Sequence, residues 1–202
     1  MMNPRKLLTA SLSLGLALGV AGAAMAQQEG GSKDSSQQVV DVGGTVANLC
    51  VLGTPSSASI NVGQLADTST ANVGKITTIA NQTVTLPGSF CNFAGTHLTI
   101  TADALLAQDT STVQSGFSRA VNFTSTVAPW ANQVAAVTTT ADLNGGTPEV
   151  TGSGGTQNTP KLTDLTLTLS NFSTGGNNTL LLVAGGYTGS VTITLGPAAV
   201  AE

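Results

Sequence analysis

Charged and aromatic side chains are scarce in this chain. Only 8% of the 202 residues are charged, 3% are aromatic, and His97 is the single histidine. Ten acidic but only four basic residues follow Ala26, so the chain beyond that point has a formal net charge of −6. A sparse, acidic surface argues against binding of nucleic acid and of anionic membranes.

Motifs of catalytic and metal sites are also lacking. The sequence contains no GxSxG, HExxH, phosphate-binding or EF-hand motif. His97 stands in the alternating stretch THLTI without a local nucleophile or acid partner, so an outward-facing strand residue is the favoured interpretation. Carboxylates occur as loop pairs of the kind that glycosidases use, namely Asp103 with Asp109 and Asp142 with Glu149. Acids in loops usually face water, and we therefore expect no enzyme, no metal and no cofactor.

A long apolar run occurs once, at the start of the chain. Arg5 and Lys6 precede a stretch rich in Leu, Ala and Gly that ends in an Ala-Met-Ala triplet at 24–26. A basic head, an apolar run and a small-x-small triplet are typical of a secretory signal peptide, here residues 1–26. The alternative is a membrane anchor, for which the run is short. We expect export from a bacterium through the inner membrane to the periplasm, then to the cell surface or medium, with no membrane span after signal removal.

The chain has two cysteines, Cys50 and Cys91. An even number of cysteines in an exported protein favours a disulfide. Closing a loop of this length stabilises a fold by about 4 kcal/mol in the chain-entropy model. A zinc site is the weaker alternative, because two cysteines and one histidine leave the tetrahedral ligand set incomplete.

Thr, Val, Gly and Asn are abundant instead, which favours strands separated by turns. Short alternating or apolar stretches predict strands at 44–52, 58–63, 74–88, 96–102, 119–127, 133–140, 162–170, 179–183 and 186–196. Helical periodicity is almost absent, apart from a short helical turn expected within 103–116. The stretch 143–160 reads as a long surface loop or a hairpin. This pattern predicts one all-β domain, an antiparallel sandwich or barrel.

The last expected strand shows the alternation clearly. Apolar residues at every second position should point into the core, and the threonines between them away from it. The inward set is Tyr187, Val191, Ile193 and Leu195, and the outward set is Thr188, Thr192 and Thr194.

Three stretches of the mature chain together resemble fimbrial subunits of chaperone-usher pili, of the type 1 pilin-like and spore coat U-like kinds. GGTVANLC (43–50) is similar to their first strand, which carries the first cysteine. VTLPGSFCN (84–92) is similar to the segment with the partner cysteine, and GGYTGSVTITL (185–195) to their last strand. The resemblance covers most of the mature chain through these three points.

The resemblance implies an immunoglobulin-like sandwich that lacks its last strand and carries one disulfide. In such subunits a periplasmic chaperone fills the open groove, and an outer-membrane usher assembles the fibre. The N-terminal extension of the next subunit then replaces the chaperone strand by β-augmentation. Here residues 27–42 would be a flexible extension, 43–202 the sandwich domain, and Tyr187 to Leu195 the groove-edge strand.

The extension departs from that pattern, because residues 27–38 are polar throughout. The candidate donor strand therefore depends on Val40 and Val42. If the first strand occupies 43–51, little apolar sequence is left for the donor, and the same stretch cannot easily serve both. The alternative is a self-contained secreted sandwich that acts as an adhesive or carbohydrate-binding module. Trp130 is the candidate sugar-stacking residue, although a lone tryptophan more often packs in a core.

Overall fold

The computed structural model describes residues 37–69, 71–146, 148–175 and 178–197, so the expected signal peptide and residues 27–36 lie outside the described part of the chain. The described residues belong to two units that meet between Gly44 and Thr45, and all ten strands lie in the second unit. No helix occurs among the described residues. The strands are β1 (Cys50–Val51), β2 (Gln82–Cys91), β3 (Thr96–Ala107), β4 (Phe117–Ser118), β5 (Ala120–Ala128), β6 (Ala135–Thr138), β7 (Glu149–Ser153), β8 (Lys161–Ser173), β9 (Leu181–Leu182) and β10 (Tyr187–Pro197).

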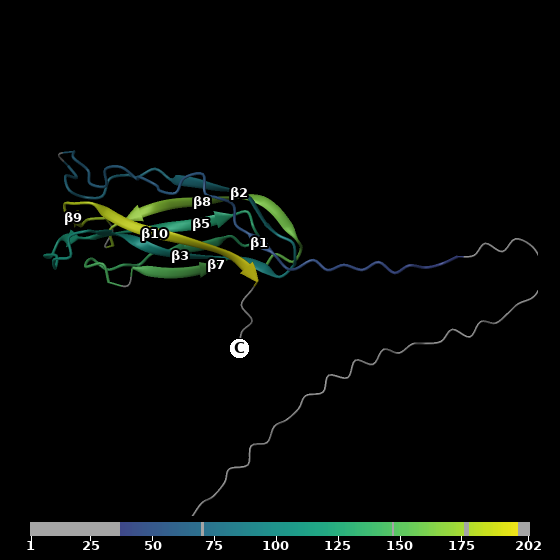
Figure 1. Cartoon of the computed structure of the whole chain (residues 1–202). Coiled ribbons are helices and arrows are strands. Elements are labelled where there is room, and N and C mark those ends of the chain that lie inside the picture. Colours follow the sequence, from purple (N-terminus) through teal and green to yellow (C-terminus); the bar gives the residue numbers. More distant parts are fainter. Residues whose placement is uncertain (1–36, 70, 147, 176–177, 198–202) are drawn as a thin grey trace, which may run out of the picture. The chain divides into compact units, whose positions relative to one another are not determined.

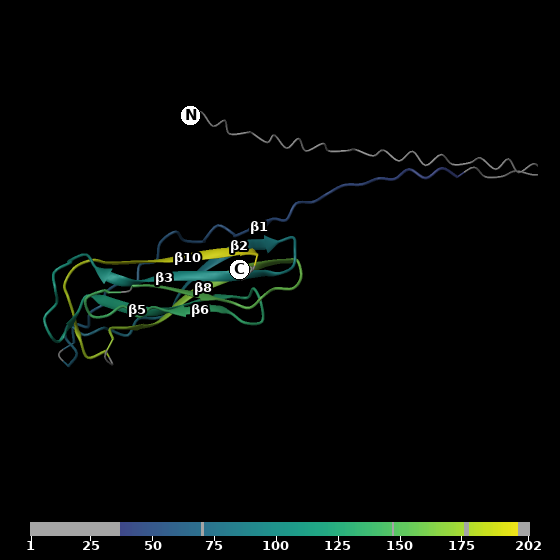
Figure 2. The same cartoon turned by 90° about the horizontal axis from the view of Figure 1, so that it is seen from below.

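Eight strands form the body of the domain in the order β1-β2-β8-β5-β3-β10, with β6 added to β5 and β7 added to β3. One layer contains β1, β2, β8, β5 and β6, and the other contains β7, β3 and β10 (Figures 1 and 2). All pairings within the body are antiparallel, and a short parallel pair, β4 with β9, lies apart from it. The expected all-β antiparallel sandwich with one disulfide is confirmed.

The two layers are joined along one side and separate along the other. The first residues of β5 pair with the end of β3, through Leu105 opposite Val121 and Leu106 opposite Ala120. On the far side, β1 and β10 are the two ends of the strand order. The sandwich is therefore closed through β3 and β5 and open between β10 and the β1–β2 edge.

Alternation places the apolar side chains between the layers. In β8, Leu165, Leu167 and Leu169 are buried, whereas the threonines between them are more exposed. In β3, Leu98 and Ile100 are buried in the same way. Because successive side chains of a strand point to opposite faces, each strand contributes one apolar row to the common core.

Two expected strands near the N-terminus are much shorter or absent. The strand expected at 44–52 is reduced to β1, and the stretch 58–63 forms no strand. Both stretches have the alternation of a strand, but strand formation also requires a hydrogen-bonding partner, and neither has one along its length among the described residues.

Two other predictions were wrong in the middle of the chain. The helical turn expected within 103–116 does not form, because β3 continues to Ala107 and pairs there with β10. The stretch 143–160, expected as a loop or a hairpin, instead contains one strand, β7, which pairs outside the stretch with β3 from Thr99 to Asp103. In the continued part of β3, the buried residues Ala102 and Ala104 keep the inward alternation with little apolar bulk.

Candidate functional site

The outer edge of β10 is open. Along its other edge β10 pairs with β3 over nearly its whole length, but the outer edge has no strand partner among the described residues. The core-facing side chains of β10 are only half-buried, although they pack against the core; they are Tyr187, Val191, Ile193 and Leu195. Their direct neighbours across the pair, Leu98 and Ile100, are fully buried. This difference in exposure shows that no neighbouring strand covers the apolar side chains of β10 on their outer side.

The segment 57–64 lies across from this edge. It is held to the domain at both ends, where Ser56 N donates to Thr85 O at 2.8 Å and Thr77 N donates to Leu65 O at 2.8 Å. Ile60 and Val62 pack against the core between these ends. Within 57–64, the hydrogen bonds seen among the described residues are local, from Ser57 Oγ to Ser59 O and from Gly63 N to Asn61 Oδ1. Like the outer edge of β10, the segment 57–64 therefore has backbone groups without a partner among the described residues.

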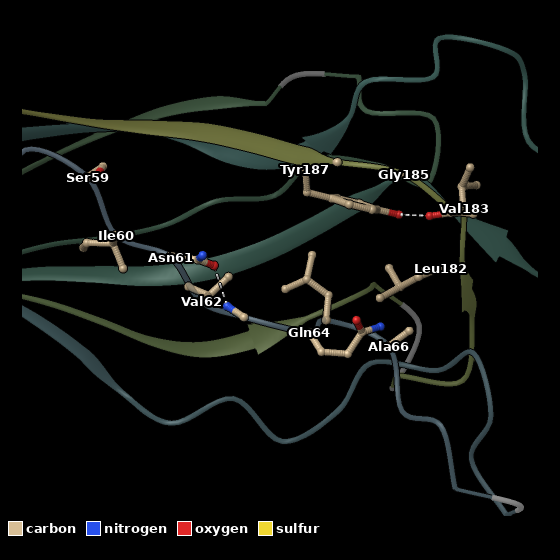
Figure 3. A pocket seen from close by; sticks show the side chains of 14 residues that line it. Ser59, Ile60, Asn61, Val62, Gln64, Ala66, Leu182, Val183, Gly185 and Tyr187 are labelled. Carbon is tan, nitrogen blue, oxygen red and sulfur yellow. Dashed lines mark hydrogen bonds between the residues drawn. The ribbon is translucent and has the colours of Figure 1, made fainter.

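A groove separates the two walls. One part of it, a cavity of about 460 Å³, is bounded by Val191 and Ile193 on one side and by Ile60 on the other. Its floor is made of core side chains, namely Val84, Leu86, Phe123, Leu167 and Leu169. A second part of about 670 Å³ continues toward β9 between 59–66 and 182–187 (Figure 3). The two parts share Ser59, Ile60, Val62 and Tyr187, so they form one groove that reaches the hydrophobic core.

Tyr187 stands where the two parts of the groove meet. Its hydroxyl donates to Val183 O at 2.9 Å, which directs the ring along the groove toward the β9 end (Figure 3). Burial of the ring raises the pKa of the Tyr187 phenol above its ordinary value of 10.0. The ring is thus partly withdrawn from water but still lines the cavity.

A bulge at Gly189 shapes the β10 wall. The register of β10 against β3 shifts between Thr188 and Ser190. A Cβ atom at Gly189 would lie 2.8 Å from Asp103 O, closer than carbon and oxygen can approach. Glycine thus permits the close backbone contact that lets β10 change register before Val191.

The candidate donor residues are exposed and lie outside every strand. Val40 and Val42 are 81% and 93% exposed, and Val46 is 87% exposed. No strand is formed between residues 37 and 49. The sequence assigned Val46 to the first strand, but β1 begins only at Cys50. The first strand therefore leaves Val46 free of pairing among the described residues, and Val46 has the same even spacing in the sequence as Val40 and Val42.

The other candidate residues do not form a site. Trp130 is only 2% exposed, so its ring has no free face for a sugar. His97 lies in β3 opposite Gly196, and its neighbours on both sides are buried. Asp103 accepts a hydrogen bond from Ser190 Oγ at 2.6 Å, and Asp142 closes its own turn by accepting from Asn144 N at 2.8 Å.

Within the described residues, no three metal-ligating side chains gather. In the same part of the chain, no helix has the length and apolar character that crossing a bilayer requires.

In comparisons with known proteins, no family model, no curated protein and no solved structure matches this chain. The groove beside β10 is the feature of this chain that bears most directly on its function.

Proposed function

We propose that this protein is a structural subunit of a bacterial surface fibre, a pilus or fimbria that serves adhesion or biofilm formation. The subunits are joined by donor-strand exchange, in which the segment containing Val40, Val42 and Val46 enters the groove of a neighbouring, identical or related subunit. A periplasmic chaperone holds the groove before assembly, and an outer-membrane usher assembles the fibre. The chain is exported with the help of residues 1–26 and ends at the cell surface.

The observation that carries this proposal is a groove with an apolar floor and unpaired backbone on both walls. A strand placed between β10 and the segment 57–64 can hydrogen-bond to both, and its alternate side chains then face the floor. An unpaired edge beside exposed core is unfavourable in a monomer, since both its backbone groups and its apolar side chains gain from a partner.

The exposed valines fit the groove in character and in reach. Each valine that moves from water into the groove contributes about 1.5–3 kcal/mol. As an inserted strand, the nine residues 38–46 would span roughly 30 Å at about 3.3 Å per residue, and the eleven residues of β10 span a similar length. Gly43 and Gly44 add no bulk between Val42 and Val46.

The proposal is tested by aspartate substitutions in the exposed segment. Val40→Asp with Val42→Asp places two charges on the side that enters the groove, and we expect loss of polymers without unfolding of the subunit. The matched control is Val39→Asp with Thr45→Asp, which adds the same charge at positions of opposite parity and should still polymerise. The measurement is the ladder of boiling-sensitive oligomers on denaturing gels, with circular dichroism to follow folding.

Equal ladders from both double variants would contradict the proposal. So would a protein lacking residues 27–42 that is monomeric, stable without chaperone and indistinguishable from a monomeric full chain. That result favours the alternative, a self-contained secreted sandwich with an adhesive or carbohydrate-binding role.

A further inference from the structure

The chain just before β1 is fastened to the domain by one side chain, Asn92. Its Oδ1 accepts a hydrogen bond from Leu49 N at 2.7 Å, and its Nδ2 donates to Ala47 O at 2.8 Å. Its own backbone N donates to Leu49 O at 3.0 Å. The Cys50–Cys91 disulfide fixes the next residue pair along the two strands. Three hydrogen bonds and a covalent link thus hold residues 47–50.

The side-chain amide of Asn92 acts here as a substitute for a backbone peptide group. Beyond Cys50 opposite Cys91, the pairing of β1 with β2 ends. The Asn92 amide offers a donor and an acceptor, as a peptide group does. Through them the hydrogen bonding to this part of the chain continues as far as Ala47. The side chain is exposed, so water competes for these bonds and their net contribution to the stability of the domain is modest.

The first residue before the fastened residues 47–50 is Val46, an exposed valine of the proposed donor segment. A flexible linker would let two joined domains take many relative orientations. Here no residue separates the segment that enters a neighbour's groove from the part of the chain that is fastened to its own domain. The direction in which the chain leaves the domain therefore governs where the neighbour is held.

We propose that Asn92 is a positioning residue for assembly: it fixes the exit direction of the donor segment and thereby sets the angle between consecutive copies of the chain in the fibre. This proposal rests on the proposed donor-strand function. It concerns the geometry of the polymer, whereas the valines determine whether a polymer forms.

The hydrogen bonds between the Asn92 side chain and residues 47 and 49 are tested on the mature chain by hydrogen exchange of the Leu49 amide. Asn92→Ala removes both side-chain bonds and should speed exchange at Leu49 roughly fivefold, the effect of one hydrogen bond of ordinary net strength. Asn92→Asp keeps the acceptor for Leu49 N and loses the donor to Ala47 O, so exchange at Leu49 should stay slow. Asn132→Ala, at another exposed asparagine, is the control and should change nothing.

The positioning role is tested on fibres by electron microscopy. Fibres of Asn92→Ala and of Asn92→Asp should still form, with normal gel ladders, but with a wider distribution of angles between successive subunits. Fibres of Asn132→Ala should match the unaltered chain. An unchanged angular distribution in Asn92→Ala, or unchanged Leu49 exchange, would overturn this proposal alone. Absence of fibres from the unaltered chain would overturn the proposed function together with it.

Discussion

Tyr187 shows how one side chain can report on the groove. Alternation predicted that it faces inward, and it packs against the core, yet it is only half-buried because it lies on an open edge. A single residue pattern specifies the face of a strand that a side chain occupies. It does not specify whether that face is covered, because the cover comes from distant parts of the chain or from another chain.

The titration of Tyr187 gives the first prediction at this scale. Burial holds the pKa of its phenol above 10.0, so the folded state binds the proton more tightly than the unfolded chain does. This contribution to stability is present below pH 10 and is lost as the pH rises through the raised pKa. Because Tyr187 is the single tyrosine, phenolate absorbance reports it alone. The midpoint should lie above that of the unfolded chain, and higher again in assembled fibres, where an inserted strand excludes water.

The control for this titration is the chain in denaturant, whose midpoint should lie near the ordinary value. If the folded monomer and the unfolded chain titrate together, the ring is not buried as described. If monomer and fibre titrate together, no strand has entered the groove beside Tyr187.

Among the elements, β10 provides the second prediction. Ile193 lies opposite Ile100 and lines the groove, whereas Thr192 lies opposite Thr101 and is exposed. Ile193→Asp places a charge against the core and should abolish accumulation of folded protein, because its cost is large relative to the stability of an ordinary domain. Thr192→Asp puts the same charge on the outer face and should lower the free energy of unfolding by less than about 1 kcal/mol.

Soluble yield and urea unfolding of the two variants measure this difference. Equal tolerance of the two substitutions would mean that the register of β10 is wrong, because a slip of one residue exchanges the two faces.

The elements also show what a sequence can and cannot predict. β8 and β10 were predicted closely, because their alternation extends over many residues and each has a long partner. β7 was not recognised as a strand, because it lies among glycines in a stretch with few apolar residues. The stretches 44–49 and 58–63 alternate like strands but have no partner strand along their length in the described part of the chain. Pairing is decided by distant segments, and in the proposed fibre the residues up to Val46 and the stretch 58–63 gain their partner from another copy.

At the scale of the whole molecule, the sandwich is closed on one side and open on the other. The β3–β5 pairing seals the layers, whereas the groove between β10 and 57–64 exposes the floor of the core. The sequence predicted two layers and one disulfide. Alternation can be recognised within each stretch, and the two cysteines can be counted directly. An open edge at Tyr187 to Leu195 was expected only through the family resemblance, because residue patterns alone do not give the order of strands in space.

The most direct test of the account is binding of the donor segment in trans. A peptide of residues 38–48 is added to the isotope-labelled chain carrying Val40→Asp and Val42→Asp, whose own segment is disabled. If the donor segment enters the groove, the amide NMR signals of β10 and of residues 57–64 should change, those of β6 and β7 should change little, and a peptide with aspartate at positions 40 and 42 should have no effect. Absence of binding, or changes that leave β10 and 57–64 unaffected, would contradict it.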